Sequence, residues 1–205
     1  MDAHSKLPAA RSVGRPREFN MDEALDAALR VFRERGYNAT SIADLRAAMG
    51  LTSGSLYKAF KDKRAIFGAV LDRYMASRDA ALAGWLAGAR TGREKVLAVL
   101  RSYAEVSHDV EGRQGCLIVG GLSDIDTFDE PLALRFRQSL SRLERLFADF
   151  IEQGIRDGSL PDRLDSRASA RYLLCVVEGL RVLGKRGARK SEVDAIVMQA
   201  MQALA

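Results

Sequence analysis

Apolar residues recur at helical spacing along nearly the whole chain, and no stretch alternates apolar and polar residues as a strand does. Capping residues and glycines divide this pattern into separate segments. The predicted helices span residues 20–35, 41–49, 53–60, 63–89, 91–108, 116–122, 130–157, 166–183 and 191–204, with breaks at 111–114 and 124–129. The pattern therefore predicts an all-α fold.

The most sharply defined part of the pattern lies between residues 40 and 63. Ser41 caps a short helix and has an acidic residue three positions later, as in a capping box. Gly50 ends that helix, because glycine takes the left-handed backbone at little cost. A second short helix follows, with Leu56 and Phe60 on its inward face. Two short helices joined by a glycine turn predict a helix-turn-helix, whose second helix can enter a DNA major groove.

The outward face of that second helix is polar and basic. Ser53, Ser55, Tyr57 and Lys58 point away from the apolar side, and Gly54 lets the backbone approach DNA closely. We expect Ser55 and Lys58 to read base edges, since lysine can donate to the acceptors of guanine.

The C-terminal part of the chain predicts longer packed helices. The helix at 130–157 carries a continuous apolar seam, and the helix at 166–183 is apolar nearly all round from Tyr172 to Leu180. A helix of that kind needs burial on more than one side, either in its own monomer or in a two-fold dimer, the arrangement common among helix-turn-helix proteins. The predicted dimer residues are Tyr172, Val176, Val177, Leu180, Leu183, Val197 and Met201.

The charge is unevenly distributed along the chain. The formal net charge is +5; residues 1–70 contain twelve Lys or Arg and eight Asp or Glu, so +4 of it lies there. This basic excess coincides with the helix-turn-helix, as phosphate binding requires. We therefore divide the chain into a flexible basic arm (1–18), a three-helix DNA-binding domain (19–64) and a helical effector-binding and dimerisation domain (65–205). Arg15 and Arg17 of the arm either enter a minor groove or form a charged tail.

Two segments of the helix-turn-helix, GYNATSIADL from Gly36 and GLTSGSLYKAFKDK from Gly50, resemble the DNA-binding domain of the TetR/AcrR family. The resemblance covers residues 14–70, and the rest matches in general plan. It implies a transcriptional repressor that binds a palindromic operator as a homodimer and is released by a small-molecule effector. It also implies phosphate contacts from Tyr57 and Lys63, and backbone contacts from Thr40 and Ser41. The pair Lys58-Ala59 departs from the common family pattern, which leaves the operator preference open.

The same resemblance implies an effector cavity in the C-terminal half. Candidate lining residues are Trp85, Tyr103, Cys116, Ile118, Phe147 and Tyr172, although each of them could equally be ordinary core. Cys116 follows Gly115 at a predicted helix start, where the helix dipole favours a thiolate. It is either a reactive thiol or a small buried hydrophobe. Cys175 lies in the apolar helix, and we expect it in the core.

Other functions receive no support from the sequence. Asp124, Asp126 and Asp129 lack the spacing of a calcium loop, and the two cysteines lack metal-site spacing, so no metal or cofactor is expected. No nucleophile–base pair suggests an enzyme. The polar, basic N-terminus and the absence of a span-length apolar run favour a cytoplasmic protein without a membrane partner. Two alternatives remain: a DNA-binding activator or architectural protein of the same fold, and a ligand-binding module or enzyme that does not bind DNA.

Overall fold

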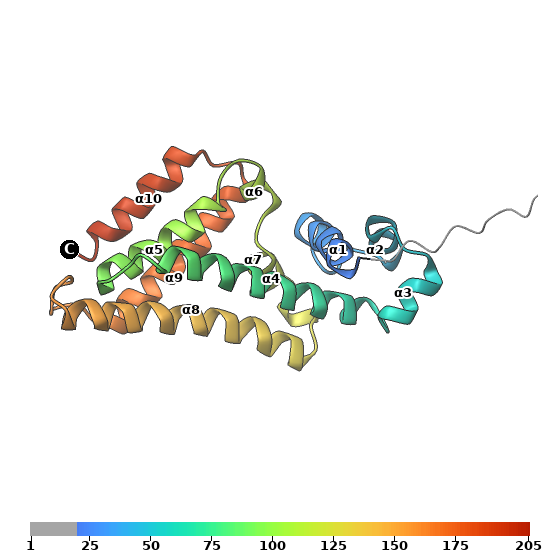
Figure 1. Ribbon diagram of the computed structural model, residues 1–205, viewed down its shortest axis with the longest axis horizontal. Coiled ribbons are helices and arrows are strands. Elements are labelled where there is room, and N and C mark those ends of the chain that lie inside the picture. The colour runs from blue at the N-terminus through green and yellow to red at the C-terminus, as the bar shows by residue number, and fades with distance from the viewer. Residues whose placement is uncertain (1–19) are drawn as a thin grey trace, which may run out of the picture.

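The computed structural model describes residues 20–205, and this part of the chain is helical with no strand (Figure 1), which confirms the predicted all-α fold. The elements are α1 (Met21–Arg35), α2 (Ile42–Met49), α3 (Ser53–Ala59), α4 (Lys63–Leu86), α5 (Gly92–Glu105), α6 (Asp109–Gln114), α7 (Leu117–Leu122), the 3-10 helix η1 (Ile125–Thr127), α8 (Glu130–Arg156), α9 (Ser166–Lys185) and α10 (Lys190–Gln202).

The local signals that predicted the first helices are present in the structure. The Asn20 side chain caps α1, and Ser41 forms a reciprocal capping box at the start of α2. Gly50 follows α2 with a φ of 66°, in the left-handed region. Asp62 accepts a hydrogen bond from the backbone N–H of Ala65 and caps α4.

The predicted break at residues 111–114 is wrong, because α6 occupies that segment. A helix of six residues shows no periodic apolar stripe in the sequence. It is held by close packing against α9: a Cβ on Gly112 would lie 3.3 Å from Gly184 Cα, so the two backbones approach at a pair of glycines. Tertiary contact therefore specifies α6 where the sequence pattern does not.

The molecule is elongated, with α1–α3 at one end and α5, α9 and α10 at the other (Figure 1). Helix α4 runs from the first group into the second, and α8 extends alongside it in the same direction. Two buried clusters form the core. The first joins Phe32, Leu45 and Leu56 to Phe67 and Phe136, so it crosses the boundary predicted after residue 64. The second surrounds Phe147, Leu173 and Val197.

The predicted apolar seam on the helix at 130–157 connects these two clusters. Phe136 belongs to the first, Phe147 to the second, and the half-buried Leu140 and Leu143 lie between them along α8. Helix α8 thus reaches from the neighbourhood of α1 and α4 to the far end of the molecule. Among residues 20–205 no helix has the length and hydropathy needed to cross a membrane.

Candidate DNA-binding surface and effector cavity

Helix α3 is anchored by one residue and exposes the others. Leu56 is 1% exposed and packs into the first core cluster, whereas Tyr57 is 60% exposed. The remaining residues predicted to face outward, namely Ser53, Gly54, Ser55 and Lys58, are also exposed. The structure therefore offers to solvent the polar face that the sequence pattern predicted, and contact of this face with DNA stays a prediction.

The start of α3 is fixed by side-chain hydrogen bonds. Thr52 Oγ1 accepts from the backbone N–H of Ser55 at 3.2 Å and donates to its hydroxyl at 2.9 Å. Arg46 of α2 donates to Ser53 Oγ at 3.0 Å and so links the two helices. Sequence reasoning missed Arg46, although a basic residue near the end of α2 was a signal for it.

Thr40 and Lys63 have structural roles that the resemblance did not imply. Thr40 is 1% exposed, and its hydroxyl donates to the carbonyl of Gly36 at 2.6 Å. The hydroxyl is therefore used inside the protein, and contact of Thr40 with the DNA backbone stays a prediction. Lys63 donates to the carbonyls of Tyr37 at 2.9 Å and Thr40 at 3.0 Å, and its ammonium lies 4.3 Å from the Tyr37 ring centroid.

The lysine thus holds the turn between α1 and α2 with two of its three donor protons, and its phosphate contact stays a prediction. Ser41 is exposed, but its hydroxyl donates to Asp44 at 2.6 Å within the capping box. The arm at 1–18, with Arg15 and Arg17, lies outside the described residues.

A cavity of about 250 Å³ lies among α4, α5, α7, α8 and α9. Tyr103, Cys116 and Ile118 line it, as the sequence analysis proposed. The other three candidates do not. Phe147 is fully buried in the second core cluster, while Trp85 and Tyr172 are 41% and 42% exposed at the surface. These predictions are wrong because helical spacing does not show which neighbour an apolar side chain meets.

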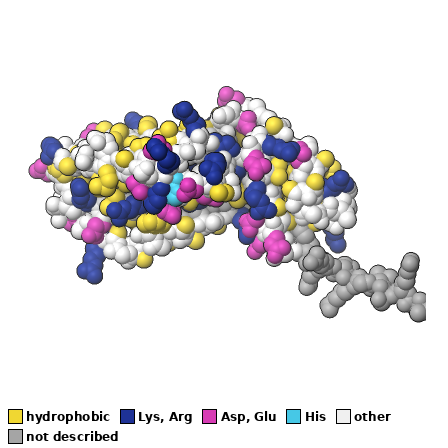
Figure 2. All heavy atoms as spheres, turned by 90° about the horizontal axis from the view of Figure 1, so that it is seen from above, with side chains coloured by type: hydrophobic (Ala, Val, Ile, Leu, Met, Phe, Trp, Pro, Cys, Tyr) yellow, Lys and Arg dark blue, Asp and Glu magenta, His cyan; other side chains and the backbone are white. Residues whose placement is uncertain are grey.

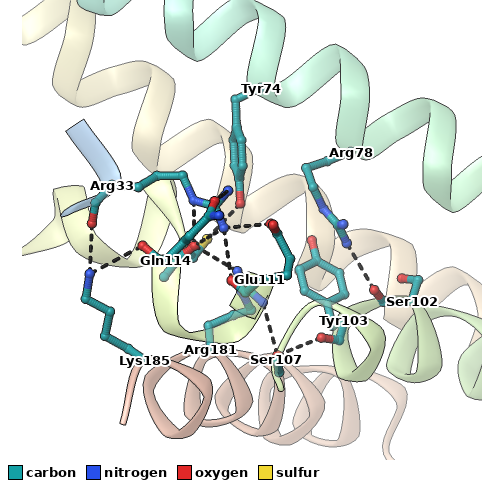
Figure 3. Close-up of polar contacts among 12 residues, drawn as sticks. Arg33, Tyr74, Arg78, Ser102, Tyr103, Ser107, Glu111, Gln114, Arg181 and Lys185 are labelled. Atoms are coloured by element: carbon teal, nitrogen blue, oxygen red, sulfur yellow. Dashed lines mark hydrogen bonds and ion pairs between the residues drawn. The ribbon is translucent and has the colours of Figure 1, made fainter. Parts of the chain in front are cut away.

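The cavity contains polar groups that the sequence analysis missed (Figure 3). The Tyr74 hydroxyl donates to Cys116 Sγ at 3.3 Å. Arg78 donates to the carbonyl of Ser102 at 3.2 Å, and its guanidinium lies 5.2 Å from the Tyr103 ring centroid. Burial raises the pKa of both Tyr74 and Tyr103, so each hydroxyl stays protonated and can donate at neutral pH.

The two cysteines are exposed in the opposite order to the expected one. Cys175 is exposed on α9, so the prediction that it lies in the core is wrong. Cys116 is half-buried at the residue that precedes α7 and faces the cavity. Its reactivity toward electrophiles stays a prediction.

A polar junction joins the first helix to the wall of the cavity (Figure 3). Arg33 of α1 donates to the carbonyl of Gly115 from Nε at 2.8 Å, and Arg181 of α9 donates to the same oxygen from Nη2 at 2.9 Å. Arg33 also pairs with Glu111 at 2.7 Å. Lys185 donates to the carbonyl of Arg33 at 3.0 Å. Because Cys116 follows Gly115, this junction borders the cavity.

Only part of the predicted dimer surface is accessible. Val177, Leu180, Val197 and Met201 are buried in the monomer's second core cluster, so their assignment to an interface is wrong. The physical reason is that α9 packs against α5, α6, α8 and α10 at once, which buries more of its circumference than a pattern can show. An apolar stripe remains open on α9, formed by the exposed Tyr172 and Val182 and the half-buried Val176 and Leu183.

Asp124 and Asp129, weighed in the sequence as calcium ligands, have structural partners. The Asp124 carboxylate accepts from the backbone N–H of Tyr37 and from Asn38, and Asp129 caps α8. Within residues 20–205 no group of three or more His, Cys, Asp or Glu side chains is arranged to hold a metal ion. On the face in Figure 2, basic and acidic side chains are interspersed with hydrophobic ones rather than gathered into one charged patch.

Comparison with known proteins matches both parts of this architecture. Residues 24–70 match the family model of bacterial regulatory proteins of the tetR family, and residues 92–201 match the tetracyclin repressor-like C-terminal domain. The HTH-type transcriptional repressor ComR of Escherichia coli K12 is 30% identical over 179 residues, which are 87% of this chain and 85% of ComR. The repressor BdcR of the same organism is 31% identical over 127 residues, 62% of this chain and 64% of BdcR.

Among solved structures, a cysteine mutant of the TetR family transcriptional regulator CifR, complexed with 26-bp double-strand operator DNA, superposes with a TM-score of 0.80. It is 32% identical, and the match covers 93% of this chain and 100% of that one. The two family models, the match to ComR over most of both chains and the helix-turn-helix lead to one conclusion: this chain belongs to the TetR family of bacterial transcriptional regulators.

Proposed function

We propose that this protein is a repressor that binds a palindromic operator as a homodimer and leaves it when a small molecule occupies the cavity. The observation that carries the proposal is α3, which is anchored by Leu56 and presents Ser55, Tyr57 and Lys58 to solvent. A short, rigidly capped helix with an exposed polar face suits insertion into a major groove. ComR and BdcR are named repressors, and CifR is complexed with its operator, which favours the same activity here.

The homodimer is supported by the apolar stripe on α9. Val182 is 50% exposed and Tyr172 is 42% exposed, and both lie on the helix beside the long α8. Large apolar side chains exposed on one helix face mark interaction sites. A second copy of this chain would cover them and would place two α3 helices for two half-sites.

Release requires that the effector bind the form that cannot hold the operator better than the form that can. The contacts around the Gly115 carbonyl can transmit a change in the cavity to the DNA-binding helices. Ligand binding at Cys116 shifts the adjoining Gly115 carbonyl, which Arg33 of α1 holds. The DNA-binding helices then change their position relative to the rest of the molecule.

The test begins with selection of bound DNA from a random pool by the full-length protein, followed by a mobility shift on the enriched site. We expect a near-palindromic site, and we expect a Lys58→Ala variant to bind it more weakly. Failure to enrich any sequence would favour the ligand-binding or enzymatic alternative. A promoter fusion separates repressor from activator, since occupancy of the site should lower transcription from it.

A further inference from the structure

Two arginines that line the cavity have no carboxylate partner. Neither Arg78 nor Arg181 forms an ion pair within 4.0 Å anywhere in residues 20–205. Arg181 is only 2% exposed, and its contacts are the neutral oxygens of Ser107 at 3.2 Å and Gly115 at 2.9 Å. A guanidinium removed from water without a counter-charge is unfavourable, so an anion in the cavity would stabilise it.

The other charged side chains of the cavity do not neutralise the positive charge of Arg78 and Arg181. At the rim, Arg142 of α8 pairs with Asp79 of α4 at 2.8 Å, and the two charges cancel. Inside, the only other charged side chain among the described lining residues is Glu178, one helical turn before Arg181. The lining therefore carries a formal charge of +1: two guanidiniums and one carboxylate inside, with a neutral pair at the rim. That balance fits a singly charged anion better than a doubly charged one.

The hydrogen-bond donors in the cavity point to an oxygen anion. Tyr103 has no hydrogen-bond partner for its hydroxyl among the described residues, and the Tyr74 hydroxyl donates only to the thiol sulfur, a weak acceptor. In Figure 3 the side chain of Tyr103 lies beside Arg78, whereas the Tyr74 hydroxyl points toward the group of contacts around Gln114. A carboxylate accepts several donors at once and matches the fork of a guanidinium.

The rest of the cavity wall is apolar. Leu82 and Leu86 of α4 face the cavity together with Leu143 and Leu146 of α8. The volume of about 250 Å³ lies below the range typical of drug-sized ligands, roughly 300–1,000 Å³, which limits the tail to a short chain or a single ring.

Building on the proposed function, we propose that the effector is a small monoanionic amphiphile: a carboxylate held by Arg78 and Tyr103, with a short apolar tail among the leucines. A cationic amine paired with Glu178 is the rival class.

The test is calorimetric titration of the full-length protein with two matched series. The first is octanoate, octan-1-ol and octylammonium, and the second is phenylacetate, 2-phenylethanol and 2-phenylethylammonium. In at least one series we expect the carboxylate to bind about tenfold more tightly than both partners. Arg78→Gln should weaken that carboxylate by about tenfold and leave the alcohol unchanged, whereas Glu178→Gln should strengthen it.

The matched control is Arg93→Gln, an exposed arginine at the start of α5 and outside the cavity, which should leave carboxylate affinity as it is. The ligand class is overturned if an ammonium compound binds as tightly as its carboxylate, if Arg78→Gln has no effect, or if neither series binds. Operator affinity is measured in parallel. Carboxylate binding that leaves the operator bound would support the ligand class and overturn the proposed effector response.

Discussion

Arg33 and Arg181 donate hydrogen bonds to the same carbonyl oxygen, that of Gly115. The first lies on α1 beside the DNA-binding helices, and the second lies on α9 against the cavity. The side chain of Arg33 is only 5% exposed, so this contact is part of the packed interior rather than a surface pair. The carbonyl of Gly115 is therefore one of the contacts that connect the DNA-binding helices to the wall of the cavity.

Replacing Arg33 should destabilise the junction. Arg33→Ala leaves Gly115, Gln114 and Glu111 without their shared donor, and we expect the free energy of unfolding to fall by about 1–3 kcal/mol. Hydrogen exchange should rise across α6. Denaturant unfolding and exchange mass spectrometry measure both effects. Arg30→Ala, at an exposed position of the same helix, is the control, and an equal loss in that variant would argue against a special role for Arg33.

Two lysines near α3 should give opposite results. Lys58→Ala should lower operator affinity by about 1–3 kcal/mol and leave the Tm unchanged, because the side chain is exposed on the recognition face. Lys63→Ala removes two hydrogen bonds from a charged donor and should lower the free energy of unfolding by about 1.5–3 kcal/mol. Fluorescence anisotropy and thermal unfolding distinguish them. If Lys63→Ala instead leaves the Tm unchanged and reduces the salt dependence of operator binding by about one unit, the predicted phosphate contact of Lys63 is supported.

Substitutions at two valines of α9 should distinguish a residue of the dimer interface from a residue of the monomer core. Val182 is 50% exposed, so Val182→Asp should dissociate the dimer while the helical signal and the monomer fold persist. Val177 is 2% exposed, so Val177→Asp places an unpaired charge in the core and should cost about 3–5 kcal/mol of stability. Sedimentation and circular dichroism report the two outcomes. A Val182→Asp protein that remains dimeric would place the interface elsewhere.

The contact between α5 and α8 should not tolerate a methyl group. A Cβ on Gly92 would lie 2.1 Å from the backbone nitrogen of Gly154 and 2.3 Å from the carbonyl oxygen of Phe150. Gly92→Ala must push two helices apart, and we expect a loss of about 1–3 kcal/mol in unfolding free energy. Gly84 of α4 has open space at its Cβ, so Gly84→Ala should stabilise the helix by about 0.5–1 kcal/mol. Equal effects of the two changes would contradict the close approach.

The ion pair between α1 and α4 predicts a specific acid sensitivity. The hydrogen bonds from Arg73, at 2.6 and 2.8 Å, lower the pKa of Asp26 below its ordinary value of 3.8. A carboxyl with a lowered folded-state pKa contributes stability above its unfolded-state pKa and loses it as the pH falls through the folded-state value.

We therefore expect Asp26→Asn to cost up to about 1 kcal/mol at neutral pH, since the pair is partly exposed, and to converge with the parent protein as the pH falls below 3.8. Urea unfolding between about pH 3 and pH 7 measures the difference. Asp126→Asn, at an exposed position of η1, should follow the parent curve throughout. A cost of Asp26→Asn that stays constant down to the lowest pH would refute the linkage.

The sequence by itself determined the all-α fold, the helix-turn-helix and the family, although it missed α6. Ser41, Gly50 and Asp62 act on the backbone within three or four residues, so their effect is readable without knowing any neighbouring element. The outward face of α3 was equally predictable, because Leu56 is the single buried position of a short helix and fixes the direction of the rest.

Only the tertiary structure decided how each helix face is used. Val177 and Val182 lie on one apolar helix, and Trp85 and Tyr103 are both large aromatic residues, yet one of each pair is exposed and the other is packed or faces the cavity. The cavity arginines escaped prediction for the same reason. Spacing along a helix shows which residues share a face, but the neighbouring helices determine whether that face meets core, cavity, solvent or a second subunit, and those neighbours are distant in sequence.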